Sequence, residues 1–165
     1  MNYKTDTHKG LFQLINREKY MGQKLPVYKS GWERKVFTMM DKNPYIMKWG
    51  YECIEIYYHN PIKQRFTIYY PDIYCNLIDI NGDNQSYLIE IKPAKMTIAP
   101  KRPEVPKTQT AQSGIRYKKA LERYSREVGD YAVNMAKWEA AQKWCLKNNV
   151  KWIIFNDMNS SGLFK

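Results

Sequence analysis

The sequence predicts an α/β protein whose core is a mixed β-sheet flanked by helices. Three observations predict it: a capping box opens a helix near residue 30, four strand-like runs follow, and a long stretch of helical periodicity leads into a final strand-like run. A strand that follows a helical crossover lies parallel to the strand before the helix. The final strand is therefore expected parallel to the fourth run. A length of 165 residues favours one domain spanning 1–165.

The elements of the first half follow from local patterns. Ser30 and Glu33 form an S-x-x-E capping box, and the helix that it opens runs to about Asp41, just before Asn43-Pro44. A three-strand meander and a fourth strand are then expected at 53–58 (CIEIYY), 66–70 (FTIYY), 73–80 (IYCNLIDI) and 87–92 (YLIEIK). The segments HNPIKQR and NGDNQ join the first pair and the last pair of these strands as turns.

The second half is dominated by one helix. Helical periodicity extends from about Gln112 to Asn148, which corresponds to about 50 Å of helix. Gly129-Asp130 is a candidate point for a bend or a break, with Asp130 as the cap of the second part. VKWIIF (150–155) is the final strand. Two segments lie outside these elements: a basic N-terminal arm or short helix packed on the core (1–28), and a proline-rich basic loop (94–112).

The charge of the chain indicates its kind of partner. There are 27 Lys and Arg against 16 Asp and Glu, a formal net charge of +11. This excess favours a polyanion, and DNA is the first candidate. An acidic protein or an anionic membrane would also attract it, but neither terminus contains the amphipathic basic helix that membrane binding requires. No segment has the length and apolarity of a transmembrane helix, so no membrane is expected.

Histidines and cysteines limit the possible chemistry. His8 and His59 are the only histidines, which argues against a zinc centre and against a histidine-based catalytic triad. Cys53, Cys75 and Cys145 are odd in number and widely spaced, as in a protein from a reducing compartment. The N-terminus, MNYKTDTHKG, lacks the apolar core of a signal peptide, so secretion is not expected. Chemistry must then come from carboxylates, lysine and a hard metal.

Two acids and one amine form the candidate catalytic site. Glu90 and Lys92 are two residues apart on a predicted strand, so their side chains point to one face, while Ile89 and Ile91 point to the other. Asp72 opens the preceding strand. Carboxylate oxygens bind Mg²⁺, and a lysine beside them orients or deprotonates a water, which is the machinery of metal-assisted phosphodiester hydrolysis. The competing interpretation is a solvated strand face with alternating charges.

Pro71-Asp72 and Glu90-Ile91-Lys92 resemble the signature of the PD-(D/E)XK nuclease superfamily. The stretch from about Lys29 to Pro93 is similar to the head-completion nucleases of tailed bacteriophages and, more distantly, to the endonuclease subunit of Tn7-type transposases. The resemblance implies a restriction-endonuclease-like α-β-β-β-α-β core. It also implies an Mg²⁺-dependent DNA endonuclease, with Mn²⁺ as a substitute metal.

The same resemblance implies a role for each site residue. Asp72 and Glu90 would bind the metal, and Lys92 would orient the attacking water. Glu33, on the first helix, matches an additional acid that many members contribute to the metal site. Glu33 has a second interpretation, because the N3 residue of a capping box binds the backbone at Ser30.

Three further residues near this framework are weaker candidates. Glu52 and Glu55 frame the first predicted strand and are alternatives to Glu33, although surface charges are the simpler interpretation. Gln142 lies on the closing helix, where some relatives place a supporting glutamine. An amide on the helix surface is the simpler interpretation there too.

A basic region follows the catalytic motif. Ten Lys or Arg and two acids lie between Lys92 and Arg126, counting both ends. A face of one sign attracts phosphates without regard to sequence, although an ordinary solvated helix face is the alternative. No recognition-helix or zinc-finger spacing is evident, so sequence-specific readout is not expected. The candidate DNA-binding residues are Lys95, Lys101, Arg102, Lys107, Arg116, Lys118, Lys119 and Arg123.

These observations lead to one functional hypothesis and two alternatives. The first is a phage endonuclease that acts on packaged DNA at head completion, located in the virion and the host cytoplasm, with portal or neck proteins as further partners. The second is a structural protein of the portal or neck that keeps the fold and the DNA-facing surface. The third is a transposase subunit that cuts only inside a complex.

Overall fold

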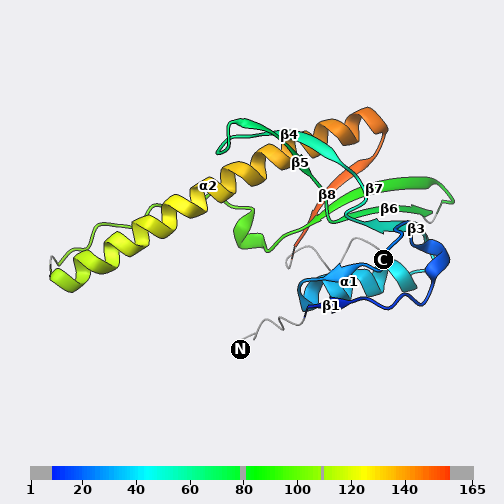
Figure 1. Ribbon diagram of the computed structural model, residues 1–165, viewed down its shortest axis with the longest axis horizontal. Helices are drawn as coiled ribbons and strands as arrows, with labels where there is room; N and C mark the ends of the chain where they lie inside the picture. The colour runs from blue at the N-terminus through cyan, green and yellow to red at the C-terminus, as the bar shows by residue number, and fades with distance from the viewer. Residues whose placement is uncertain (1–8, 79–80, 109, 157–165) are drawn as a thin grey trace.

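A four-stranded mixed sheet forms the centre of the computed structural model, which describes residues 9–78, 81–108 and 110–156. Its strand order is β3 (Ile46–Tyr51), β6 (Ile73–Ile78), β7 (Asn84–Ile91) and β8 (Lys151–Phe155). The first three strands are antiparallel, and β8 is parallel to β7, as the sequence predicts. Figure 1 shows helix α1 (Gly31–Lys42) on one side of the sheet. On the other side lie the β4–β5 hairpin (Ile56–Asn60 and Arg65–Tyr69) and helix α2 (Ala111–Asn148).

Alternate residues of β7 contribute to two hydrophobic cores. Ile89 and Ile91 belong to the core that also contains Phe37 of α1 and Trp49 of β3. Leu88 belongs to the second core, between the sheet, the hairpin and α2. Since side chains alternate along a strand, Glu90 faces the same side as Leu88. The face of β7 that carries Glu90 is therefore the face toward α2 and the hairpin.

The first strand of the central sheet is β3, which the sequence analysis did not predict. Its burial does not alternate, because Trp49 and Gly50 are both buried, and its register with β6 shifts between Ile46 and Lys48. The predicted meander is wrong in its first two members: among the described residues, β4 and β5 pair only with each other. The order α1-β3-β6-β7-α2-β8 keeps the predicted α-β-β-β-α-β layout, with the hairpin inserted between β3 and β6.

Helix α2 is continuous over its whole length, so it does not break at Gly129-Asp130 and Asp130 caps no second helix. A Cβ added to Gly129 would lie 3.7 Å from Ile62 Cδ1, which places the hairpin turn directly over this glycine. Packing of the hairpin against the helix therefore supports a glycine position, where helix propensity is low. The helix begins at a capping box formed by Thr110 and Ser113.

The described part of the N-terminal segment, residues 9–28, packs on the α1 side of the sheet. It contains two-residue strands β1 (Gly10–Leu11) and β2 (Val27–Tyr28) and a 3₁₀ turn, η1 (Arg17–Lys19). Phe12 and Tyr20 enter the first core. The remainder of the expected arm, residues 1–8, lies outside the described residues. A second 3₁₀ turn, η2 (Ala94–Met96), follows β7. Within the described residues, no helix is long and apolar enough to cross a membrane.

Candidate active site

The register of β6 and β7 brings the two acids together. Ile73 pairs with Ile89, so Asp72, one residue before β6, lies opposite Glu90. The backbone N–H of Ile91 donates a 2.7 Å hydrogen bond to Asp72 Oδ2, which fixes the Asp72 carboxylate against β7. The predicted juxtaposition of Asp72 and Glu90 therefore follows from one antiparallel pairing.

Glu90 is buried and has two side-chain partners. Tyr69 Oη, on β5, donates a 2.5 Å hydrogen bond to Glu90 Oε2. Lys92 Nζ lies 3.3 Å from Glu90 Oε1, which confirms that Glu90 and Lys92 share a face. The Glu90 side chain is only 6% exposed, so solvent screens this ion pair poorly. The amine is thus held beside the carboxylate pair.

The environment of Asp72 opposes ionisation of its carboxyl group. Burial, and next the charge of Glu90, raise the pKa of Asp72 to about 8, against the lowering effect of the Ile91 N–H. The pKa of Tyr69 is also raised, first by burial and then by Glu90, so its phenol stays neutral and remains a donor. Two like charges in a partly desolvated place are stabilised by a divalent cation.

Glu33 lies in the first turn of α1, close enough that its charge contributes to the raised pKa of Asp72. Its carboxylate accepts a hydrogen bond from the backbone N–H of Lys29, while Ser30 Oγ accepts one from the N–H of Glu33. The cap is thus formed, with Lys29 rather than Ser30 as the donor to the glutamate. In the described part of the chain, no three His, Cys, Asp or Glu side chains gather as metal ligands.

The weaker candidates have other partners. Glu52 pairs with Lys29 Nζ at 2.9 Å, and its backbone N–H donates to the Asp72 carbonyl. Glu55 accepts a hydrogen bond from Tyr70 Oη on the exposed side of the hairpin. Gln142 is exposed on α2.

Lys137 is a site residue that the sequence analysis missed. From α2 its Nζ lies 5.4 Å from the ring centre of Tyr69 and 5.9 Å from that of Tyr58. Burial lowers the pKa of Lys137; the charge of Glu90 opposes this shift and that of Lys92 adds to it. A second amine therefore faces the carboxylate pair from the opposite layer. No sequence motif marks Lys137 or Tyr69, because only the docking of α2 and the hairpin brings them to β7.

The candidate DNA-binding residues are all exposed and lie on one continuous part of the chain. Lys95 is in η2, Lys101, Arg102 and Lys107 precede α2, and the remaining four are in the first half of α2. The structure separates two of them, because successive residues of a helix are about 100° apart, so Lys118 and Lys119 face different directions.

The site fits a divalent metal on its donor chemistry. Asp72 Oδ1 takes part in none of the hydrogen bonds described, and each Glu90 oxygen accepts one bond and keeps a second lone pair. Hard cations prefer such carboxylate oxygens. Together with Lys92, these acids form the D…E-x-K set on an α-β-β-β-α-β core. This fold and this site define a nuclease of the PD-(D/E)XK class.

Comparison with known proteins places the chain within that class. The family model described as TnsA-like endonuclease N terminal matches residues 43–157. The head completion nuclease of Enterobacteria phage T4 is 33% identical over 143 residues, which cover 86% of each chain. The chain therefore belongs to this endonuclease family. It is an endonuclease, and its class implies a divalent metal cofactor.

Proposed function

We propose that the protein is an Mg²⁺-dependent DNA endonuclease that acts in the completion of phage heads. The observation that supports the chemistry is the partly buried Asp72 beside the buried Glu90, with the Lys92 amine 3.3 Å from Glu90. The support for head completion is the similarity to the phage T4 head completion nuclease over most of both chains.

Each site residue has a role in this proposal. Asp72 and Glu90 would hold Mg²⁺, or Mn²⁺ in its place, and Glu33 is the candidate for a third acid. A bound divalent cation polarises a phosphoryl oxygen and lowers the pKa of a bound water. Lys92 holds the attacking water near the phosphate and offsets charge there. Tyr69 holds the Glu90 carboxylate in position.

Cleavage of supercoiled plasmid tests the chemistry. The protein is expected to nick or cut plasmid in Mg²⁺ or Mn²⁺ and to stop in EDTA, with Ca²⁺ supporting binding but poor turnover. Asp72→Ala, Glu90→Ala and Lys92→Ala should each lower the rate by at least about 100-fold while DNA binding is kept. Glu55→Ala removes an exposed acid outside the site and is the matched control. Cutting at the wild-type rate by any of the three site variants would refute the assignment.

Complementation of a phage that lacks its head completion nuclease tests the biological role. The wild-type chain is expected to restore infectious particles, and Glu90→Ala is expected to fail although it is incorporated normally. Restoration by Glu90→Ala would instead support a structural role at the portal or neck. If the wild-type chain cuts plasmid but does not restore infectious particles, the role in head completion is refuted and the nuclease assignment stands.

A further inference from the structure

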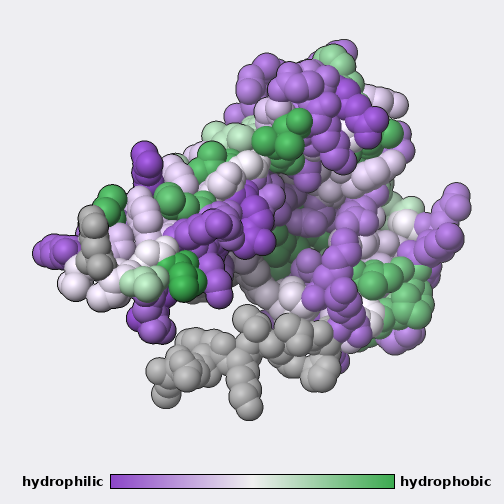
Figure 2. Space-filling view, turned by 60° about the vertical axis from the view of Figure 1, so that its left-hand side comes forward, coloured by the Kyte–Doolittle hydropathy of each residue, from purple (hydrophilic) through white to green (hydrophobic). Residues whose placement is uncertain are grey.

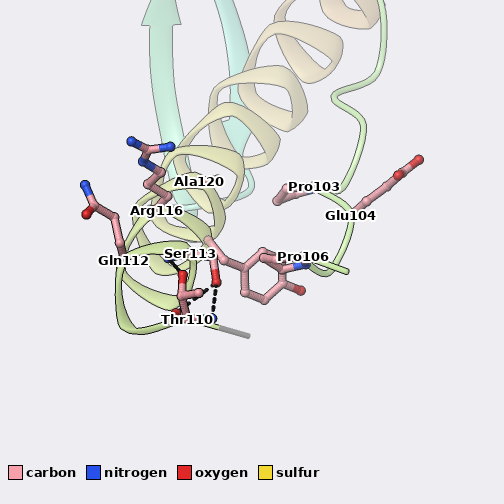
Figure 3. A pocket seen from close by; sticks show the side chains of 9 residues that line it. Pro103, Glu104, Pro106, Thr110, Gln112, Ser113, Arg116 and Ala120 are labelled. Carbon is pink, nitrogen blue, oxygen red and sulfur yellow. Dashed lines mark hydrogen bonds between the residues drawn. The ribbon is translucent and has the colours of Figure 1, made fainter. Parts of the chain in front are cut away.

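The first half of α2 projects from the body of the protein as an arm. The buried residues of α2 are Asn134, Trp138, Ala141 and Cys145, and residues 111–128 contain none. Figure 1 shows this half extending beyond the sheet, with the segment that precedes α2 running back along it. That segment and the helix enclose a shallow cavity of about 380 Å³ near the tip. In Figure 3, Arg116 points away from Pro103 and Pro106, so the preceding segment leaves it uncovered.

One face of the arm continues the face of α2 that meets the active site. At 3.6 residues per turn, Arg126 and Lys119 lie about three and five turns before Lys137, within about 20° of its direction. Arg123 lies about 40° to one side. We call Lys119, Arg123 and Arg126 the basic stripe. All three side chains are exposed, and Figure 2 shows hydrophilic residues bordering a hollow beside the body.

Acids on or near this face do not neutralise it. Asp130 shares the direction of Lys137, while Glu122 and Glu127 lie about 60° and 80° away. Glu127 pairs with Arg123 at 3.6 Å, and both side chains are more than half exposed. Such an exposed pair contributes little to stability, so a phosphate can readily replace Glu127 as the partner of Arg123.

We propose that the basic stripe binds the phosphate backbone of duplex DNA on one side of the cleavage site. The inference rests on the proposed function for the location of the scissile bond. A rise of about 1.5 Å per residue puts Arg126 about 17 Å and Lys119 about 27 Å from Lys137. At about 3.4 Å per base pair, these distances correspond to about 5 to 8 base pairs beyond the scissile phosphate.

The lack of packing and the positive charge of the arm indicate that its binding partner is a polyanion. A helix without a buried face gains little from packing, and its like charges repel one another. Duplex DNA carries one negative charge per about 1.7 Å of its axis and would relieve that repulsion along the whole stripe. A second copy of this chain, with a net charge of +11, offers no such excess of negative charge.

The salt dependence of binding tests the stripe without relying on activity. The triple variant K119Q/R123Q/R126Q and the control K24Q/K42Q/K147Q remove equal charge, and the control residues are exposed outside the arm. Affinity for a 30-base-pair duplex would be measured in EDTA over a range of salt. Each lost phosphate contact lowers the slope of log affinity against log salt by about 0.9. The slope for the stripe variant should be smaller than the wild-type slope by about 2 to 3, and the slope for the control by less than 1. Equal slopes, with both proteins folded by circular dichroism, would overturn the proposal.

The positions of cuts test the one-sided geometry. On an end-labelled linear duplex, wild-type cuts should be depleted within about 5 to 8 base pairs of one end of each strand. This end should be the 5′ end of both strands or the 3′ end of both strands. The stripe variant should lose this asymmetry. Depletion at both ends alike, or asymmetry that persists in the stripe variant, would refute the one-sided arm. If the wild type does not cut at all, the endonuclease proposal fails, while the salt slopes still decide whether the stripe binds DNA.

Discussion

The phenol of Tyr69 donates a 2.5 Å hydrogen bond to the carboxylate of Glu90 and thereby joins the inserted hairpin to β7. The partner of Glu90 on its other oxygen, Lys92, comes from β7 itself. Glu90 is therefore oriented by two elements, of which only one carries the recognisable motif. The hairpin thus contributes directly to the geometry of the site.

Tyr69→Phe removes this hydrogen bond and keeps the ring. We expect a loss of about 10- to 100-fold in cleavage rate or in affinity for Mg²⁺, which is the usual effect of losing a partner that orients a metal ligand. Plasmid cleavage as a function of Mg²⁺ concentration measures both. Tyr57→Phe is the control, since Tyr57 lies on the same hairpin and is 66% exposed. Equal effects of the two substitutions would contradict the role of Tyr69.

Lys137→Met removes the second amine while the apolar stem keeps its packing against the tyrosine rings. If Lys137 contacts the phosphate, cleavage should fall by about tenfold or more, the contribution of a hydrogen bond to a charged group. Lys137→Arg should recover part of the rate. Lys143→Met, which changes an exposed lysine on the same helix, is the control. An unchanged rate in Lys137→Met would remove this residue from the site.

The raised pKa of Asp72 predicts how stability depends on pH in metal-free protein. The pKa is about 8 in the folded state against an ordinary value of 3.8, so between these values the folded state holds a proton that the unfolded state has lost. The free energy of unfolding should therefore fall as pH rises from about 4 to 8. Thermal melts in EDTA measure this, and Asp72→Asn should flatten the decline. A decline of equal size in both proteins would exclude Asp72 as its source.

The two interpretations of Glu33 predict different variants. As a cap alone, Glu33→Gln should keep both activity and melting temperature, because an amide oxygen also accepts the Lys29 N–H. As a metal ligand, the same change should lower activity with little change in melting temperature. Glu33→Ala should lower the melting temperature under either interpretation. Full activity of Glu33→Gln would exclude a ligand role.

Gly129→Ala tests the continuity of α2. An alanine there raises helix propensity by about 1 kcal/mol, and its Cβ would make ordinary contact with Ile62. We expect an increase in melting temperature of a few degrees. Gly82→Ala is the contrasting substitution, because Gly82 has φ +85° in the turn before β7, so alanine should destabilise it. A lower melting temperature for Gly129→Ala would indicate that α2 is interrupted at this position.

Local sequence patterns were sufficient for much of the fold. The capping box located α1, the helical periodicity located α2 to within one residue at its start, and the alternation of β7 put Glu90 and Lys92 on one face. These features depend on residues close together in the chain. The strand β3 was missed because its buried residues do not alternate and its register with β6 shifts between Ile46 and Lys48.

The proximity of Asp72, Glu90 and Lys92 was therefore predictable from the sequence itself, because the pairing of consecutive strands and the two-residue period determine which side chains meet. Tertiary structure alone decided the surroundings of this set. The hairpin had the pattern of sheet strands, yet it packs on α2, and this placement brings Tyr69 to Glu90 and Lys137 to the facing layer. Docking of one element on another depends on complementary surfaces formed by residues distant in sequence, and no local period encodes it.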